Sequence, residues 1–349
     1  TPDVEVIALD DETVSFVGMT PETLFCFKDY GVSPVESDWA FWTFDEGSSF
    51  LIAPGIQIHL KTLGDGISAD SDVRIITVTQ AEAPDDITVV HSETPDGNGL
   101  VYMTDMHEYK AWLESENEWA ASWEDAGVEG SISLPQGKYL VRVKANGAML
   151  ASEPVEIIVA CVPEVVSTSP NDGDNDAEFN SPAIEITFGV PMDKYCGKII
   201  INNNGSTLIH TDFQNSWTSK QNLVERFFGF PSGVSFTVTL REFKSEDGVL
   251  MPDYEFSFAT REGNIEKAET ENGSFIVIKA DDETETEITS SGAFEVLKVI
   301  ATPDRGYRLS AAIIQSLSYP SNFDAYPYNT FPMPNDDIRI NVTFEEISY

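Results

Sequence analysis

Cysteine is scarce in this chain, which has only three among its 349 residues. Cys26, Cys161 and Cys196 are too few and too unevenly spread for a disulfide scaffold, and they form no CxxC metal-binding pattern. Cys26 lies in an apolar run, where a thiol acts as a small buried hydrophobe. Cys161 and Cys196 could form a disulfide, and the sequence leaves this pairing open.

Basic residues are also few, at 20 Lys and Arg against 59 Asp and Glu, and the formal net charge is −39. The field around such a chain repels phosphate backbones and anionic membrane surfaces, which argues against nucleic acid as a partner. The acidic residues are spread along the whole sequence. We therefore expect solvated faces of folded modules, cation-rich surroundings, or both.

No stretch of the sequence approaches the roughly 20 apolar residues of a membrane-spanning helix. The chain opens with Thr1, Pro2 and Asp3, without a methionine and without a basic segment followed by an apolar one. We expect no membrane insertion, and we expect any export signal to have been removed already. We also expect the chain to be monomeric in this excised form.

Catalytic motifs are missing as well. The four histidines are scattered, with no serine elbow, HExxH or Cys/His signature near them, at His59, His91, His107 and His210. Carboxylate pairs occur everywhere in so acidic a chain, so a glycosidase pair cannot be recognised by counting. We predict that the protein is not an enzyme.

What the sequence does contain is a repeated β-hairpin pattern. Residues 134–159 read as a turn, an alternating strand, a loop and a second alternating strand, and a similar segment stands upstream. Matching Gly137 with Gly55 gives an offset of 137 − 55 = 82, and matching Tyr109 with Phe27 gives 109 − 27 = 82. The first half of the chain is therefore predicted to be a tandem repeat.

This spacing favours several small domains over one large one. We predict an all-β protein of four β-sandwich, Ig-like or β-grasp-like modules in a linear array, over residues 1–81, 82–160, 161–262 and 263–349. Short linkers are expected at 81–86, 161–163 and 263–271.

One segment of the second module has an alternative. Residues 105–127 are rich in Glu, Ala, Trp and Leu and could form an amphipathic helix. The first-module counterpart carries Gly31 and Pro34, which disfavour a helix. We predict strands in both copies, with room for one helical turn in the second.

The second module holds segment 106–110, then Trp119, then LPQGKYLVRVKA followed by LASEPVEIIV. These residues resemble a repeat found in modular surface proteins of bacteria. In that family a Gly-x-Tyr-x-Val-Arg strand belongs to an immunoglobulin-like sandwich, and the resemblance implies the same fold here.

The third module carries a Ser-Pro turn, an acidic loop, a Pro-Met-Asp and two strands of period two. The residues are Ser169-Pro170, 171–176, Pro191-Met192-Asp193, Ile184-Ile186-Phe188 and Tyr254-Phe256-Phe258-Thr260. Together they resemble the bacterial Ig-like domain of the S-layer type.

In the fourth module, strands are predicted at 274–280 and 294–302. Pro303, Gly306, Tyr307, Met333 and Phe344 resemble the divergent form of the listerial internalin B repeat, a small β module of bacterial surface proteins. The resemblances imply an exported bacterial protein, and they name modules rather than activities.

Tryptophans provide one candidate binding site. Trp39, Trp42, Trp119 and Trp123 lie in the first two modules, and an indole exposed on a sheet can stack on a sugar ring. Small sandwiches also need large core residues, and Trp often serves this purpose in Ig-like folds. Core packing is therefore the alternative for these four residues.

An acidic loop provides a candidate metal site. Asp172, Asp174 and Asp176 place carboxylates at alternate positions, as in loops that bind Ca²⁺. Ala177 and Ala183 stand where an EF-hand needs its Gly and Glu, so a solvated turn is the alternative. Apart from structural Ca²⁺, no cofactor is expected.

From these patterns and resemblances we predict a non-catalytic spacer or adhesion stalk, extracellular or attached to the cell surface. It would present or bind a host or cell-wall protein or glycan. The first alternative is a carbohydrate-binding protein that uses the Trp-bearing faces of the first two modules. The second alternative is a calcium-stiffened assembly protein of the S-layer type.

Overall fold

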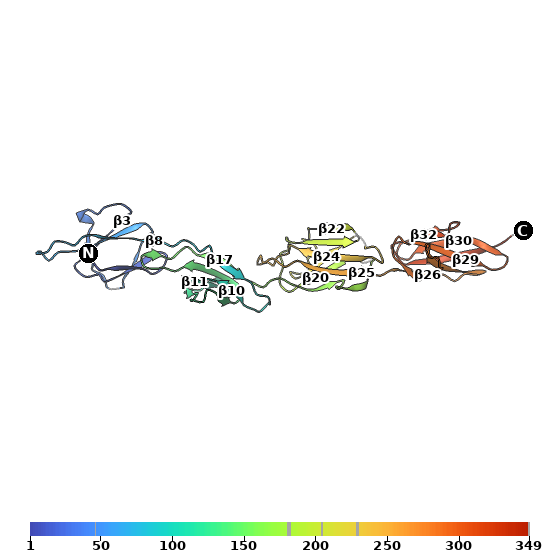
Figure 1. Cartoon of the computed structure of the whole chain (residues 1–349), viewed down its shortest axis with the longest axis horizontal. Helices are drawn as coiled ribbons and strands as arrows, with labels where there is room; N and C mark the ends of the chain where they lie inside the picture. The colour runs from blue at the N-terminus through green and yellow to red at the C-terminus, as the bar shows by residue number, and fades with distance from the viewer. Residues whose placement is uncertain (46, 180–182, 204, 228–229, 348–349) are drawn as a thin grey trace. The chain divides into compact units, whose positions relative to one another are not determined.

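Figure 1 shows the computed structural model of the chain, which describes all residues except 46, 180–182, 204, 228–229 and 348–349. Its regular structure consists almost entirely of strands, and the one helical element among the described residues is the 3-10 helix η1 (Glu36–Asp38). The chain divides into two compact units, Thr1–Cys161 and Val162–Tyr349. No helix in the described part of the chain is long and apolar enough to cross a membrane. The predicted all-β fold is confirmed.

The first module is a sandwich of two antiparallel sheets. One sheet runs β1 (Glu5–Ala8), β2 (Thr13–Val17), β5 (Ser49–Leu51), and the other runs β4 (Ala40–Phe41), β3 (Thr23–Asp29), β6 (Ile56–Thr62), β7 (Arg74–Thr77). Alternate residues of each strand point inward, so Val14 and Phe16 from one sheet meet Ile58 and Leu60 from the other in a shared core.

The second module repeats this arrangement. Its smaller sheet runs β9 (Thr88–Val90), β10 (Gly99–Tyr102), β14 (Ile132–Leu134), and its larger sheet runs β12 (Glu118–Trp119), β11 (His107–Leu113), β15 (Gly137–Val143), β17 (Val155–Val159), with β13 (Glu124–Asp125) also paired to β11. Both predicted hairpins form, β6 with β7 and β15 with β17.

The helix alternative for residues 105–127 is wrong. His107 and Tyr109 alternate into the protein interior from strand β11, and both are buried. The short helical turn lies in the first module instead, at η1.

The repeat itself is real, but the uniform offset of 82 is wrong. Strands β3 and β11 have the same length, as do β6 and β15, and aligning their ends matches Phe25 with Tyr109 (109 − 25 = 84) and Leu60 with Val141 (141 − 60 = 81). The cross-strand pairs agree, because Leu60 lies opposite Phe25 and Val141 lies opposite Tyr109. Phe25 and Phe27 point to the same face of the strand, because side chains two residues apart share a face. The alternating pattern alone could not tell them apart.

The loop between β15 and β17 connects the two modules of the first unit. Within it, β16 (Met149–Leu150) pairs in parallel with β8 (Thr79–Gln80), which follows the first-module hairpin. We call residues 144–154 the docking loop. Its Leu150 side chain is fully buried in the core of the first module, although the loop belongs to the second.

Backbone hydrogen bonds hold the docking loop at several points. Ala8 N donates to the Gly147 carbonyl at 2.6 Å, and Ala81 N donates to the Leu150 carbonyl at 3.0 Å. In the other direction, Ala151 N donates to the Asp10 carbonyl at 3.0 Å. The first two modules are thus joined by shared core and shared backbone pairing, besides the chain that links them.

The third module is also a sandwich. Its sheets run β18 (Val165–Ser169), β20 (Ala183–Phe188), β23 (Asn222–Arg226), and β19 (Asp174–Ala177), β25 (Tyr254–Thr260), β24 (Ser235–Arg241), β21 (Lys198–Asn203), β22 (Ser206–His210). Both strands predicted from period-two patterns are present as β20 and β25. Their inward residues Ile186 and Phe256 are almost completely buried.

The fourth module is a sandwich of a five-stranded and a three-stranded sheet. They run β28 (Ser290–Ser291), β26 (Gly263–Lys267), β33 (Ile338–Glu346), β30 (Tyr307–Ser316), β31 (Asn322–Asp324), and β27 (Gly273–Lys279), β29 (Val296–Pro303), β32 (Thr330–Pro332). The two predicted strands form as β27 and β29. The predicted linker at 263–271 is wrong over Gly263–Lys267, because Ile265 is buried and its strand pairs in parallel with β33.

Arg261 joins the two modules of the second unit. Its guanidinium donates to both carboxylate oxygens of Asp337 at 2.8 and 3.0 Å, and to both oxygens of Glu178 at 3.1 Å. Nearby, Ser232 N donates to the Asn335 side chain at 2.8 Å. Glu178 and Ser232 belong to the third module and Asp337 and Asn335 to the fourth, so side chains fix this junction.

Candidate functional site

The two first-module tryptophans predicted to bind sugar have different surroundings. Trp42 is buried, with its ring 5.4 Å from Phe16 and 5.7 Å from Phe25 between centroids. Trp39 is half-buried, and the Lys61 ammonium lies 4.7 Å from its ring centroid. Trp42 is therefore part of the core, and one face of Trp39 carries a cation.

The two second-module tryptophans predicted to bind sugar, Trp119 and Trp123, are half-buried. Trp119 packs edge-on against Trp112 at 5.1 Å, across the β11–β12 pair. Trp123 is covered by two cations, with Arg142 at 4.1 Å and Lys110 at 4.7 Å from its ring centroid. Sugar binding by Trp39, Trp42, Trp119 and Trp123 stays a prediction.

The acidic loop of the third module is tied to the neighbouring strand. The Asp172 carboxylate accepts a hydrogen bond from Ser257 N at 2.9 Å, and the Asp174 carboxylate accepts one from Asp176 N at 3.0 Å. Among the described residues, no group of three or more His, Cys, Asp or Glu side chains is placed to hold a metal ion. Calcium binding by Asp172, Asp174 and Asp176 stays a prediction.

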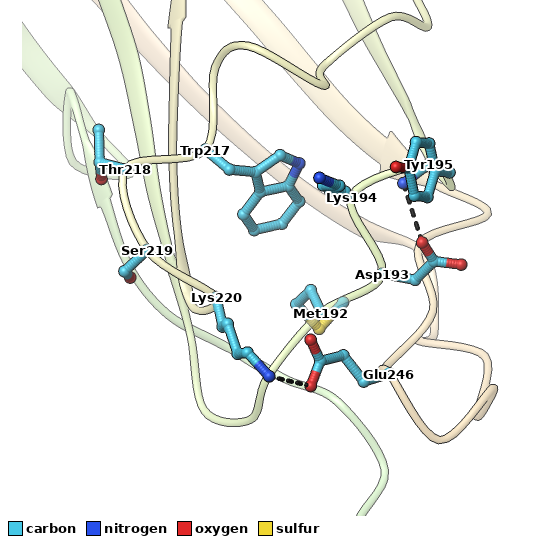
Figure 2. Close-up of a pocket in the computed structure, with 9 residues that line it drawn as sticks. All are labelled: Met192, Asp193, Lys194, Tyr195, Trp217, Thr218, Ser219, Lys220 and Glu246. Atoms are coloured by element: carbon cyan, nitrogen blue, oxygen red, sulfur yellow. Dashed lines mark hydrogen bonds and ion pairs between the residues drawn. The ribbon is translucent and has the colours of Figure 1, made fainter.

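A cavity lies elsewhere in the third module (Figure 2). It has a volume of about 540 Å³ and is lined by residues of three loops that are far apart in the sequence. These are residues 192–195 between β20 and β21, residues 217–220 between β22 and β23, and Glu246 between β24 and β25. We call it the Trp217 pocket.

Backbone hydrogen bonds fix the three loops to one another. Met192 N donates to the Lys220 carbonyl at 2.8 Å, and Glu246 N donates to the Pro191 carbonyl at 3.0 Å. Met192 itself is buried beneath the pocket, with 2% of its surface exposed. The pocket is therefore built into the fold and does not depend on a ligand to assemble it.

Aromatic surface lines the pocket. The Trp217 ring packs against Phe188 of the core at 5.6 Å, and Tyr195 is 67% exposed at the opposite side. Among the described residues, the buried Trp217 Nε1 atom has no hydrogen-bond partner. A buried N–H without an acceptor is rare in native proteins, but this one is too deeply buried to face a ligand in the pocket.

Two lysines and two carboxylates line the pocket, so their formal charges balance. Lys220 pairs with Glu246 at 2.8 Å. The Asp193 carboxylate accepts hydrogen bonds from Tyr195 N and from the Cys196 thiol, and these bonds hold the pKa of Asp193 below its usual value. Lys194 lies 5.1 Å from the Tyr195 ring centroid, and the described residues provide it with no carboxylate partner.

Cys196 is a free thiol, so it forms no disulfide with Cys161. Its burial, together with the bond to Asp193, raises its pKa, which leaves the thiol protonated and unreactive at neutral pH.

Sequence reasoning missed Trp217 and Tyr195. One signal was available, because Trp217 stands in the polar segment Asn215–Lys220 with no alternating pattern around it. A large aromatic residue in a polar loop is a candidate for binding, because binding residues are concentrated on loops.

No protein-family model matches the sequence, and comparison with curated proteins finds no match. Among solved structures, the chain is similar to the FN1–FN3 domains of chicken CNTN1, at 12% identity and a TM-score of 0.23 over 74% of this chain and 98% of that one. A segment of two fibronectin type-III domains from chicken tenascin has 14% identity and a TM-score of 0.28, over 51% of this chain and all of that one.

A tetra-tandem repeat from the extending region of a large adhesion protein has 8% identity and a TM-score of 0.29, over 99% of this chain and 98% of that one. These TM-scores are too low for the likenesses to carry an argument. The fold class rests on the sheets and cores of this chain.

Proposed function

We propose that this chain is a non-catalytic spacer of an adhesion protein outside the cell, and that it presents or binds a protein or glycan. The observation that carries the proposal is the docking loop, which places Leu150 of one module in the core of its neighbour. Modules on a flexible linker move relative to each other by default. Here such movement would have to withdraw Leu150 from the core and break backbone hydrogen bonds.

Two further observations support a spacer. The second unit has its own fixed junction at Arg261, so a stiffened pair of modules occurs twice in the chain. The net charge of −39 repels other acidic surfaces and keeps such a molecule soluble at high local concentration. The sequence resemblances to surface modules of bacteria support a bacterial, cell-surface setting.

The stiffness of the first unit can be measured as a distance distribution between two spin labels. Ile67 in the first module and Val128 in the second are 95% and 86% exposed, and both can be changed to cysteine in a chain whose natural cysteines are replaced by alanine. We expect one narrow distribution, which broadens in the Leu150→Ala variant and stays narrow in a Leu51→Ala control, because Leu51 is 80% exposed. A broad distribution in the unaltered chain would contradict the spacer proposal.

A second candidate function is carbohydrate binding, and the Trp217 pocket is the observation that favours it. Aromatic rings suit the face of a sugar, and the exposed Lys194 suits a sugar that bears a carboxylate. We propose uronate-containing oligosaccharides as the first ligands to test, by titration followed through tryptophan fluorescence. We expect a saturable change in fluorescence that is lost in the Trp217→Phe variant and retained in the Trp39→Phe variant. If only the Trp39→Phe variant lost the change, the binding site would lie in the first module.

A further inference from the structure

The outer face of the larger sheet in the first module is covered, although the outer face of a sandwich is commonly open to solvent. Alternate side chains of β3 and β6 point away from the core of the sandwich. Four of these side chains are nevertheless at most 9% exposed, namely Leu24, Cys26, His59 and Lys61. A part of the chain outside the two sheets must therefore lie over them.

The cover is the segment that leads from β3 through η1 to β4, residues 30–39. Its Asp38 carboxylate lies 2.7 Å from the ammonium of Lys28 on β3. Its Trp39 ring has its centroid 4.7 Å from the ammonium of Lys61 on β6. Contacts to both strands hold this segment over the face between them, and we call it the η1 cover.

Beneath the η1 cover, Cys26 and His59 lie directly opposite each other. They are partners in the β3–β6 register, so their side chains share the outer face. The Cβ atoms of such a pair lie about 4.5–5.5 Å apart. Cys26 is 5% exposed and His59 is 3% exposed. A thiol and an imidazole therefore meet in a closed space.

The imidazole of His59 has both ring nitrogens unused. Among the residues that the structure describes, neither Nδ1 nor Nε2 has a hydrogen-bond partner, although both atoms are buried. Burial and, as a smaller effect, the charge of Lys28 hold the pKa of His59 below its usual value, so the ring is neutral at pH 7 and keeps a lone pair on one nitrogen. A buried polar side chain without a partner is rare in native proteins, and an ion is one of the groups that satisfies it.

The two side chains suit one class of metal. Zinc takes four ligands and calcium six to eight, whereas no group of three or more His, Cys, Asp or Glu among the described residues is placed to hold a metal ion. Cu(I) is stable with two ligands in a line, and thiolate and imidazole are ligands that it prefers. One thiolate cancels the single charge of Cu(I), so the complex is neutral and avoids the cost of a buried net charge.

We propose that Cys26 Sγ and a ring nitrogen of His59 bind one Cu(I) ion between β3 and β6. On binding, the thiol releases its proton to solvent and the metal takes its place, without a change of oxidation state. Metal bonds of roughly 2.3 Å to sulfur and 2.0 Å to nitrogen, the lengths known for zinc, fit the spacing of the pair. The net charge of −39 concentrates cations at the surface of the chain. This site is independent of the spacer function, and it would add a metal other than Ca²⁺ to the expected cofactors.

Anaerobic titration of the full chain with Cu(I), in competition with a coloured Cu(I) chelator, tests the proposal. X-ray absorption at the copper edge then identifies the ligands. We expect one tightly bound copper per chain, with one sulfur and one imidazole nitrogen as its nearest neighbours. This measurement needs no variant, so it stays valid where a substitution in the closed space disturbs folding. Failure to bind Cu(I), or a copper surrounded by sulfur alone, would overturn the proposal.

Three variants locate the ion. Cys26→Ser and His59→Gln should each weaken the affinity by more than the roughly 10–100-fold that loss of an outer-shell partner costs, because each removes a direct ligand. Cys196→Ser is the control, since this half-buried thiol belongs to the third module and donates to Asp193, and the variant should bind copper as the unaltered chain does.

Two results would contradict the assignment. Binding that survives in Cys26→Ser, or that is lost equally in Cys196→Ser, would place the ion at another thiol. Binding that is lost in Cys26→Ser and unchanged in His59→Gln would reduce the site to a thiol alone. Either result overturns the proposed pair.

Discussion

Ser71 and Ser152 make the same pair of hydrogen bonds in two different modules. Each hydroxyl accepts a bond from the backbone N of the last residue of the preceding strand, Thr62 or Val143, at 2.9 Å. Each also donates to the carbonyl of the following residue, at 3.0 and 2.9 Å respectively. With the offset of 81, residues 63–73 of the first module are therefore the structural counterpart of the docking loop.

The two loops differ in the side chains that decide where they bind. Where the docking loop has Leu150 and Ala151, the first module has Ala69 and Asp70. The Asp70 carboxylate accepts a bond from Gly64 N at 3.0 Å and pairs with Lys61 at 3.2 Å, so this loop is closed on itself. The hydrogen bond from Gly64 N and, as a smaller effect, the ion pair with Lys61 hold the pKa of Asp70 below its usual value. A loop of the same shape therefore connects two modules where it carries the apolar side chain of Leu150.

The first prediction concerns that side chain. Leu150→Ala should destabilise the first module by about 3 kcal/mol, because it removes a fully buried side chain from a packed core. Amide hydrogen exchange at Ala8 and Ala81 should then be roughly a hundredfold faster, since both donate to the docking loop. Leu51→Ala, at an exposed site of the first module, should leave these rates unchanged. Unaltered rates in Leu150→Ala would mean that the loop does not stabilise its neighbour.

The second prediction concerns the junction of the second unit. Arg261→Ala should cost about 1–3 kcal/mol in urea unfolding, because it leaves Asp337 and Glu178 without their shared donor. The matched control is Arg339→Ala, which removes a pair with Glu266 that is about half exposed on both sides and should cost under about 1 kcal/mol. Equal losses for the two variants would show that Arg261 is an ordinary surface residue.

The third prediction is a pH dependence of the same junction. The hydrogen bonds from Arg261 hold the pKa of Asp337 below its usual value, against a smaller opposing effect of burial. A depressed carboxyl pKa stabilises the fold above the unfolded value of about 4, and this contribution is lost as the pH falls through the folded pKa. The second unit should therefore lose stability in acid more steeply than its Asp337→Asn variant. Asp253→Asn, in an exposed pair with Arg241, should follow the unaltered chain.

The sequence predicted the sheets well, because alternation of period two is a local signal. The hairpins β6–β7 and β15–β17 and the strands β20 and β25 all follow from it. The docking loop could not be predicted in this way. Leu150 has no alternating neighbours, and its burial depends on strands of a different module.

The candidate site was beyond the sequence for a related reason. The Trp217 pocket combines three loops whose proximity follows only from the order of strands in two sheets. The cations that cover Trp39 and Trp123 also come from other segments of the chain. Residue type indicated that aromatic rings were present, and tertiary contacts decided which faces remain open.

The last prediction concerns Arg142, which links the modules of the first unit electrostatically. Its side chain is buried, donates to Glu108 of its own module at 2.7 Å and to Asp11 of the first module at 3.2 Å, and covers the Trp123 ring. Arg142→Ala leaves the half-buried Glu108 unpaired and uncovers the indole. We expect the free energy of unfolding to fall by about 3 kcal/mol, because removing one partner leaves the other charge without compensation. We also expect the tryptophan emission to shift to the red.

Two comparisons separate this effect from a simple loss of charge. Lys144→Ala removes a neighbouring pair with Asp125, which is 73% exposed, and should change neither stability nor emission by a comparable amount. Arg142→Lys retains the charge and loses the planar fork that bonds two carboxylates at once, so it should recover only part of the stability. Full recovery in the Lys variant would mean that charge alone holds this contact, and the geometry of the guanidinium between the two modules would then be irrelevant.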